Sequence, residues 1–88
     1  MDDITLNKEE FKLFDQDDQM GFFYDDDGWP KEGAEINFEA DVNKLYEEYD
    51  FICVDSEDNI YGVKNQEKEL IMENVIEAYE IALEVKDL

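Results

Sequence analysis

Hydrophobic residues recur at helical spacing in the middle of the chain, over residues 38–49. They fall three or four residues apart and define one face of a helix: Phe38, Val42, Leu45, Tyr46 and Tyr49. Asn37 directly precedes this run and is a favoured N-cap residue. Glu39 and Asp41 place negative charge in the first turn, at the positive end of the helix dipole. The pattern therefore predicts a helix over residues 38–49.

Two short apolar runs follow and are typical of β-strands. Phe-Ile-Cys-Val-Asp occupies residues 51–55, Ile-Tyr-Gly-Val-Lys occupies residues 60–64, and polar residues 56–59 lie between them. Two such runs joined by a four-residue polar loop predict a β-hairpin. Cys53 is the only cysteine, so no intrachain disulfide can form, and we expect its thiol to be buried as a small hydrophobe.

Helical spacing returns from Gln66 to Lys86, where one broad apolar face is formed by Leu70, Ile71, Val75, Ala78, Tyr79, Ala82 and Leu83. Asn65 precedes this segment and can serve as its N-cap. We therefore expect one long C-terminal helix. Four further residues widen its apolar arc beyond what packing on one sheet requires, and they either pack under the N-terminal segment or form a homodimer surface: Met72, Ile76, Ile81 and Val85.

The N-terminal segment carries a helix-start signal. Asn7 followed by Glu10 is a capping box, and it precedes Phe11 at the start of an apolar run. This pattern predicts a short helix of about two turns. Ile4 and Leu6 alternate with polar residues, so the same stretch also fits a strand.

An aromatic run, Met-Gly-Phe-Phe-Tyr at residues 20–24, predicts another strand, followed by a loop that extends through Gly33. Trp29 lies in this loop, directly before the only proline. Its side chain is either a lid on the core or an exposed anchor, and the high average burial of tryptophan favours the lid.

Together these elements predict an α+β fold: one small domain over residues 1–88, with an antiparallel sheet of three or four strands packed by two helices, one of them a long, acidic, amphipathic C-terminal helix. Hydrophobic residues make up 43% of the chain, enough for a core without a metal or disulfide. A lone thiol fits a reducing cytoplasm. The chain shows neither a signal-peptide pattern nor an apolar stretch of membrane-spanning length.

Charge is the most unusual property of the chain, because 27 acidic residues oppose seven lysines and give a formal net charge of −20. Such a surface repels nucleic acid and anionic membranes. We therefore expect no direct binding to either and a cationic protein as the partner.

On the predicted C-terminal helix, six carboxylates recur every three or four residues and form one stripe: Glu69, Glu73, Glu77, Glu80, Glu84 and Asp87. The stripe would be about 27 Å long with a charge about every 5 Å, compared with one phosphate per roughly 3.4 Å of a DNA strand. Ordinary surface helices interleave lysines, since like charges four residues apart are destabilising. The stripe is either a solvated helix face or a substitute for a phosphate backbone.

The chain offers little for catalysis or for metal binding. It has no histidine and no arginine, and its single serine lies in a predicted turn. Residues 15–21 and 23–28 are rich in aspartate but do not place glycine and ligands as an EF-hand requires. We expect no enzyme activity, no catalytic residue, no designed metal site and no cofactor.

In size, charge and stripe geometry the chain resembles the DNA-mimic inhibitors that phages and mobile elements direct against restriction and CRISPR enzymes. The resemblance implies binding to the cationic DNA- or RNA-binding surface of a target protein. The stripe would be extended by two acidic clusters, Asp25, Asp26 and Asp27 and then Glu47, Glu48 and Asp50, with Trp29, Tyr24 or Tyr61 as anchors.

Three alternatives fit the same sequence. The chain is also of the size and acidity of immunity proteins or antitoxins that neutralise cationic nuclease toxins. An acidic adaptor domain would bind through apolar surface and use its charge only for solubility. A calcium-binding protein would use the aspartate-rich loops, although these depart from the EF-hand pattern.

Overall fold

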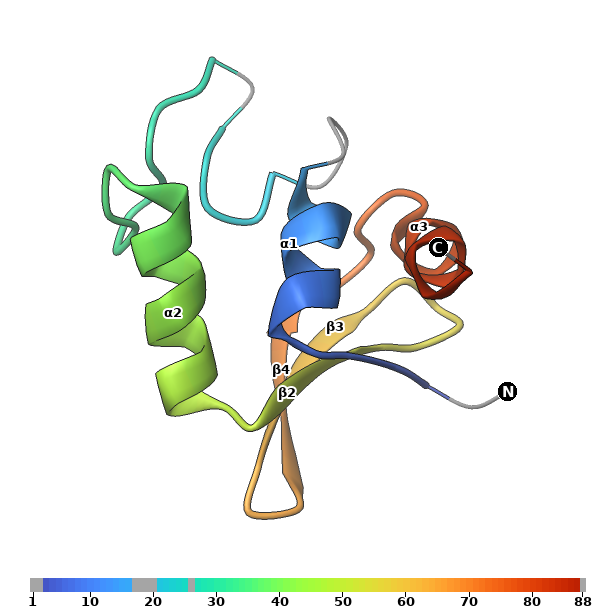
Figure 1. Cartoon of the computed structure of the whole chain (residues 1–88). Coiled ribbons are helices and arrows are strands. Elements are labelled where there is room, and N and C mark those ends of the chain that lie inside the picture. Colours follow the sequence, from blue (N-terminus) through green and yellow to red (C-terminus); the bar gives the residue numbers. More distant parts are fainter. Residues whose placement is uncertain (1–2, 17–20, 26, 88) are drawn as a thin grey trace.

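The computed structural model describes residues 3–16, 21–25 and 27–87. Along the chain the elements are β1 (Ile4–Leu6), α1 (Lys8–Asp15), α2 (Phe38–Glu48), β2 (Phe51–Val54), β3 (Ile60–Lys64), β4 (Glu67–Met72) and α3 (Ala78–Lys86) (Figure 1). The four strands form one antiparallel sheet in the order β1-β2-β3-β4. The predicted α+β class and antiparallel sheet are therefore confirmed, with three helices among the described residues in place of the two expected.

The core lies between the sheet and the helices. Alternate residues of the central strands point to the helix side, and Ile52, Val54 and Ile60 are almost fully buried there. Helix α1 lies between α2 and α3 and contacts both (Figure 1). Phe11 and Phe14 of α1 have no exposed surface. The sheet and three helices therefore share one apolar cluster.

The N-terminal segment contains both of the elements that its sequence pattern allowed. Ile4 pairs with Val54, which makes β1 an edge strand of the sheet. The predicted capping box then starts α1: the Asn7 side chain accepts a hydrogen bond from the Glu10 amide at 2.9 Å, and the Glu10 carboxylate accepts one from the Asn7 amide at 3.0 Å. The chain therefore passes directly from the edge strand β1 into helix α1 at the capping box.

The central helix and the hairpin are confirmed. The Asn37 side chain accepts a hydrogen bond from the Ala40 amide at 3.2 Å at the start of α2. Phe51 of β2 pairs with Val63 of β3. The thiol of Cys53 is buried, as predicted for a lone cysteine inside a strand.

The predicted strand at residues 20–24 is wrong. Met20 lies outside the described residues, residues 22 and 23 form bends, and Tyr24 makes a single bridge with Pro30. The Phe22 amide donates to the Asp15 side chain at 3.1 Å instead of to a neighbouring strand. The rings of Phe22 and Phe23 both pack against Phe11 of α1, whereas successive side chains of a strand would point to opposite faces.

The long C-terminal helix is also wrong, because α3 begins only at Ala78 and residues 67–72 form β4. Asn65 and Gln66 have φ angles of +53° and +68° and make the two-residue turn of a tight hairpin between β3 and β4. Asparagine favours both an N-cap and this left-handed conformation, and the predicted N-cap role of Asn65 is wrong. The following residues, 67–72, then form a strand because pairing with β3 outweighs the helical spacing of their apolar side chains.

Helix α3 is capped by a residue from another part of the chain. Glu77 occupies the N-cap position with a φ of +61° and makes no capping bond with its own side chain. The Asp58 carboxylate, in the β2–β3 loop, accepts a hydrogen bond from the Tyr79 amide at 3.0 Å. The Asp58 carbonyl also accepts one from the Val75 amide at 3.0 Å. These bonds fix the start of α3 against the hairpin.

Gly62 is required by close packing between β3 and the end of α2. A Cβ at this position would lie 2.5–2.7 Å from three ring atoms of Tyr49. We expect Gly62→Ala to lower the free energy of unfolding by about 1–3 kcal/mol, because the ring must move. Urea unfolding measures this loss, and in a Tyr49→Ala background most of it should vanish. An equal loss in both backgrounds would show that the ring contact is not the cause.

Candidate binding surface around α3

The structure divides the predicted acidic stripe among different elements. Glu69 lies on β4, where its carboxylate accepts a hydrogen bond from the Tyr49 hydroxyl at 3.0 Å. Glu73 lies in the connection between β4 and α3, and Glu77 precedes α3 with a left-handed backbone. The remaining three carboxylates, Glu80, Glu84 and Asp87, lie on α3 or at its C-cap. A continuous helical stripe of six charges is therefore a wrong prediction.

Long-range hydrogen bonds bring a second acidic segment to the start of α3. Besides the two bonds made by Asp58, the Asn74 amide donates to the Asn59 side chain at 3.2 Å. The β2–β3 loop is thereby fixed beside residues 73–79. We call the combined set the acidic α3 surface: Asp55, Glu57, Asp58, Glu73, Glu77, Glu80, Glu84 and Asp87. The local sequence carries no signal for this arrangement, because it depends on contacts between distant segments.

The loop part of the acidic α3 surface is ordered by its own carboxylate. Asp55 accepts hydrogen bonds from the Glu57 and Asn59 amides, both at 2.9 Å. Burial raises the pKa of Asp55, but these donors and the Asn59 side chain outweigh it, so the pKa lies below its usual value. Asp55 therefore stays charged at neutral pH and holds the loop in one conformation.

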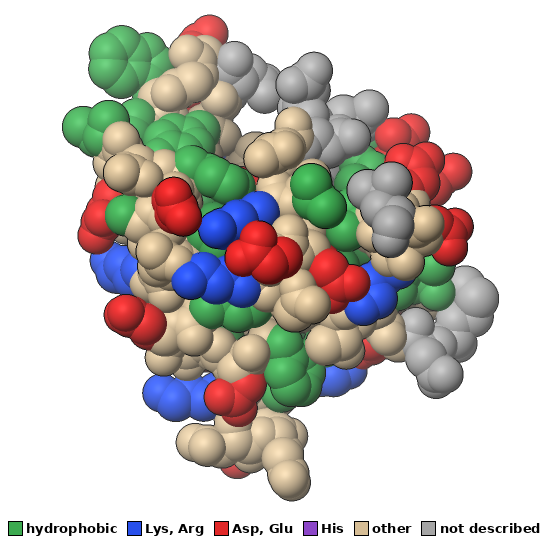
Figure 2. Space-filling model, in the orientation of Figure 1, with side chains coloured by type: hydrophobic (Ala, Val, Ile, Leu, Met, Phe, Trp, Pro, Cys, Tyr) green, Lys and Arg blue, Asp and Glu red, His purple; other side chains and the backbone are tan. Residues whose placement is uncertain are grey.

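The lysine side chains that form ion pairs turn to other parts of the molecule. Lys12 contacts Glu9 at 3.7 Å and Glu39 at 3.5 Å, and Lys86, although it belongs to α3, contacts Glu10 of α1 at 2.8 Å. Lys68 pairs with Asp3. Basic and acidic side chains accordingly alternate over the centre of the view in Figure 2, whereas acidic ones predominate towards α3. Within the described part of the chain, no ion pair involves the acidic α3 surface.

The other predicted acidic clusters lie elsewhere. Asp25 and Asp27 lie in the loop before α2, and Asp26 falls outside the described residues. Glu47 and Glu48 are exposed at the C-terminal end of α2. A third residue, Asp50, follows α2 and accepts a hydrogen bond from the Asn65 amide at 3.2 Å. Since α1 separates α2 from α3 in Figure 1, these clusters form separate surfaces and do not extend the acidic α3 surface.

The exposure of apolar side chains decides between the alternatives predicted for Trp29 and for the apolar residues of the C-terminal segment. Trp29 is 70% exposed, so the prediction that it covers the core is wrong. Ile81 and Val85 of α3 are buried in the core, where α3 packs against β1 and α1, so the predicted packing under the N-terminal segment is confirmed for these two, while Ile76 is 72% exposed. The other two proposed anchors, Tyr24 and Tyr61, are half-buried, and the Tyr24 hydroxyl donates to Asp41 at 2.9 Å. Trp29 is therefore the most exposed of the three predicted aromatic anchors.

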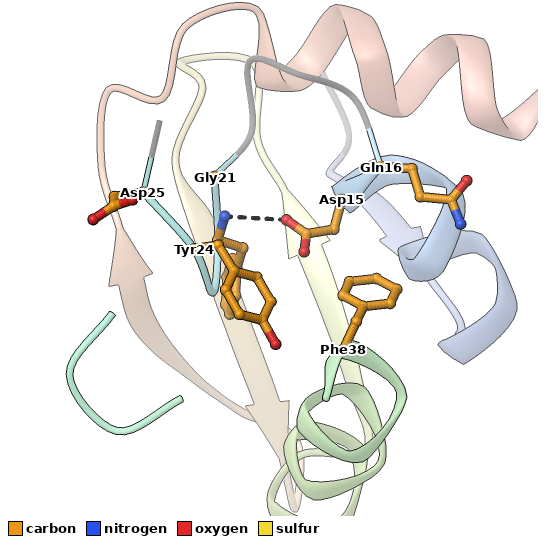
Figure 3. A pocket seen from close by; sticks show the side chains of 7 residues that line it. Asp15, Gln16, Gly21, Tyr24, Asp25 and Phe38 are labelled. Atoms are coloured by element: carbon orange, nitrogen blue, oxygen red, sulfur yellow. Dashed lines mark hydrogen bonds between the residues drawn. The ribbon is translucent and has the colours of Figure 1, made fainter. Parts of the chain in front are cut away.

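A cavity of about 220 Å³ lies between the end of α1 and the start of α2 (Figure 3). Its lining residues are Asp15, Gln16, Gly21, Phe22, Tyr24, Asp25 and Phe38. The Asp15 carboxylate faces the cavity, whereas that of Asp25 points away from it (Figure 3). Asp25 instead accepts hydrogen bonds from amides of its own loop. Among the described lining residues, no second carboxylate faces Asp15 across the cavity as the acid–base pair of a glycoside hydrolase would.

Asp15 should make stability depend on pH. Burial raises the pKa of Asp15 to about 6, although the Phe22 amide and the charge of Lys31 lower it, while the charge of Asp41 raises it. The folded protein therefore keeps a proton that the unfolded chain loses near pH 4. The contribution of Asp15 to the free energy of unfolding falls as the pH rises from about 4 to 6 and does not recover at higher pH.

We expect Asp15→Asn to raise the free energy of unfolding by about 1–2 kcal/mol at pH 7, allowing for partial solvent exposure, and to change little at pH 4. The asparagine oxygen can still accept the bond from the Phe22 amide. Urea unfolding at both pH values measures the difference, with Glu84→Gln as an exposed control. A gain of the same size at both pH values would exclude titration of Asp15 as its cause.

Two features that other functions would need are absent from the described residues. No group of three or more histidine, cysteine, aspartate or glutamate side chains within residues 3–16, 21–25 and 27–87 is placed to hold a metal ion. In the same ranges, no helix combines the length and the apolar character that a membrane span requires. Comparisons with protein-family models, with curated proteins and with solved structures found no match.

Proposed function

We propose that this protein is an inhibitor that mimics nucleic acid and binds the cationic nucleic-acid-binding surface of a target protein. The acidic α3 surface is the observation that supports the proposal. It combines eight carboxylates from two segments of the chain, and in the described structure no lysine forms an ion pair with them. An ordinary solvated face would be expected to mix the two signs of charge.

The geometry of α3 suits a site that normally holds phosphates. At about 1.5 Å per residue, Glu80, Glu84 and Asp87 are spaced about 6 and 4.5 Å apart along the helix axis. Lysine and arginine bind carboxylates and phosphates through the same charge-assisted hydrogen bonds. Because the surface is fixed by the Asp58 cap and the Asp55 turn, little further ordering is needed on binding.

The charge of the whole chain supports the same mechanism. A formal charge of −20 attracts a cationic cleft over a long range and gives fast, salt-sensitive association. The biological setting would be the cytoplasm of a host cell, with either a defence nuclease or a nuclease toxin as the target. The inhibitor itself performs no catalysis in this scheme.

Competition for DNA tests the proposal. A panel of purified enzymes would contain a restriction endonuclease, a CRISPR effector nuclease and a cationic nuclease toxin domain. We expect the protein to displace duplex DNA from at least one of them, and the affinity to fall steeply between about 50 and 200 mM salt. Binding that neither competes with DNA nor depends on salt would instead indicate an adaptor that uses apolar surface.

A further inference from the structure

The loop between Tyr24 and α2 presents apolar side chains to solvent. We call residue 25 and residues 27–36 the Trp29 loop. Trp29 is 70% exposed and Ile36 is 92% exposed. Hydrophobic side chains gather at the upper left of Figure 2, where Figure 1 places this loop. A tryptophan side chain can bury about 150–250 Å², so its exposure forgoes a large stabilisation that the core would have supplied.

Both ends of the Trp29 loop are fixed to α2 by one buried carboxylate. Asp41 is 3% exposed. It accepts hydrogen bonds from the Tyr24 hydroxyl, at 2.9 Å, and from the Glu35 amide. The Tyr24 hydroxyl also contacts the Glu35 carbonyl at 2.8 Å. A buried charge is tolerated only when it is well paired, so these bonds firmly define the base of the loop.

Further hydrogen bonds within the loop hold the backbone of Trp29 in place. The Asp25 carboxylate accepts bonds from the Asp27 amide at 3.0 Å and the Trp29 amide at 2.9 Å. The Asp25 amide donates to the Trp29 carbonyl at 2.9 Å, and the Lys31 amide donates to the Phe23 carbonyl at 2.7 Å. The loop is therefore preorganised with its indole directed outwards.

We propose that the Trp29 loop is a preformed anchor, which inserts the indole into an apolar pocket bordered by lysine or arginine on the protein partner. Interface hot spots are enriched in tryptophan, and preorganisation reduces the entropy lost on binding. The charges around the loop favour a cationic border: Asp25, Asp27, Glu32 and Glu35 are exposed beside the single cation Lys31. The identification of this partner with a nucleic-acid-binding protein rests on the proposed function.

The anchor is a second contact, separate from the acidic α3 surface. Helix α1 lies between the Trp29 loop and α3 in Figure 1, so the two regions occupy different sides of the domain. A partner that contacts both must surround the domain from two sides, as a cleft or channel does. Variants of the two regions should then have additive effects on binding free energy.

The test uses the enzyme that the protein inhibits in the DNA competition assay. We expect Trp29→Ala to weaken binding about 30-fold or more, mainly through faster dissociation, with no change in the salt dependence. Trp29→Phe should recover part of the affinity, and Leu70→Ala, at a 49% exposed residue of β4, should change it little. Because Trp29 is the only tryptophan, its fluorescence emission should shift to shorter wavelength on binding.

The outcomes separate the two proposals. Wild-type affinity of Trp29→Ala for an inhibited enzyme would overturn the anchor and leave the proposed function standing. If no enzyme is inhibited, the proposed function fails. The anchor is then tested by cross-linking in host lysate, with the photoreactive residue p-benzoylphenylalanine in place of Trp29. The control carries the same residue in place of exposed Leu13. A cross-link formed only from position 29, to a protein that after purification shifts the Trp29 emission, would support the anchor. Absence of such a cross-link would overturn it.

Discussion

Replacing Glu73, Glu80 and Glu84 by glutamine and Asp87 by asparagine should abolish inhibition of the target enzyme without unfolding the protein. All four side chains are exposed, so the free energy of unfolding should change by less than about 1 kcal/mol. Each lost contact with lysine or arginine costs about 0.5–1 kcal/mol, and together they should weaken binding about 100-fold at low salt. Titration of the enzyme at several salt concentrations measures the loss and the reduced salt dependence.

A second quadruple variant controls for total charge. Glu9, Glu39, Glu47 and Glu67 lie on α1, on α2 and on β4, outside both proposed contacts, and their replacement by glutamine removes the same four charges. We expect only a few-fold loss of affinity, arising from weaker long-range attraction. Equal losses in both variants would indicate general attraction without a defined surface, and full inhibition by the first would exclude the acidic α3 surface.

Phe11→Ala should have the largest effect on stability. The Phe11 ring is fully buried, and its centroid lies 5.1 Å from that of Phe22, 5.9 Å from those of Phe14 and Tyr46, and 6.1 Å from that of Phe23. This one side chain joins α1 to α2 and to the irregular segment before the Trp29 loop. Truncation leaves a cavity where several aromatic rings meet and should cost about 3–5 kcal/mol.

A loss of that size is comparable with the total stability of many small domains, roughly 0.05–0.15 kcal/mol per residue. Urea unfolding followed by circular dichroism measures it. Leu13→Ala on the same helix is the matched control, because Leu13 is 47% exposed, and it should cost less than about 1 kcal/mol. A cost below about 1.5 kcal/mol for Phe11→Ala would show that the surrounding rings collapse into the space.

The elements that could be predicted from sequence are those with local causes. The capping box of Asn7 and Glu10 acts within one turn of helix, and the apolar spacing of residues 38–49 defines the buried face of α2. The β2–β3 hairpin follows from two apolar runs and a polar loop between them. Each of these signals lies inside the element that it predicts.

The C-terminal half shows where local signals are insufficient. A two-residue hairpin turn usually carries glycine at its second position, and Gln66 conceals that signal. Glu67 to Met72 fit either periodicity, and only the availability of β3 as a pairing edge selects the strand. Trp29 is named from the sequence as a lid or an anchor, but the fixing of its loop has no local signal: the buried Asp41 lies in α2, and its bonds to Tyr24 and Glu35 cannot be derived from spacing.

The Asp58 cap gives the acidic surface a dependence on tertiary structure that a disordered acidic tail would not have. Tyr79 and Val75 are held by a hairpin loop more than ten residues away in sequence, so the carboxylates of the loop and those of α3 meet only after the hairpin has formed. A denatured chain has the same charge but a different spacing of it. On heating, inhibition should therefore be lost cooperatively, along the unfolding curve, although no acidic residue is removed. Proteolytic cleavage of the hairpin should abolish inhibition for the same reason.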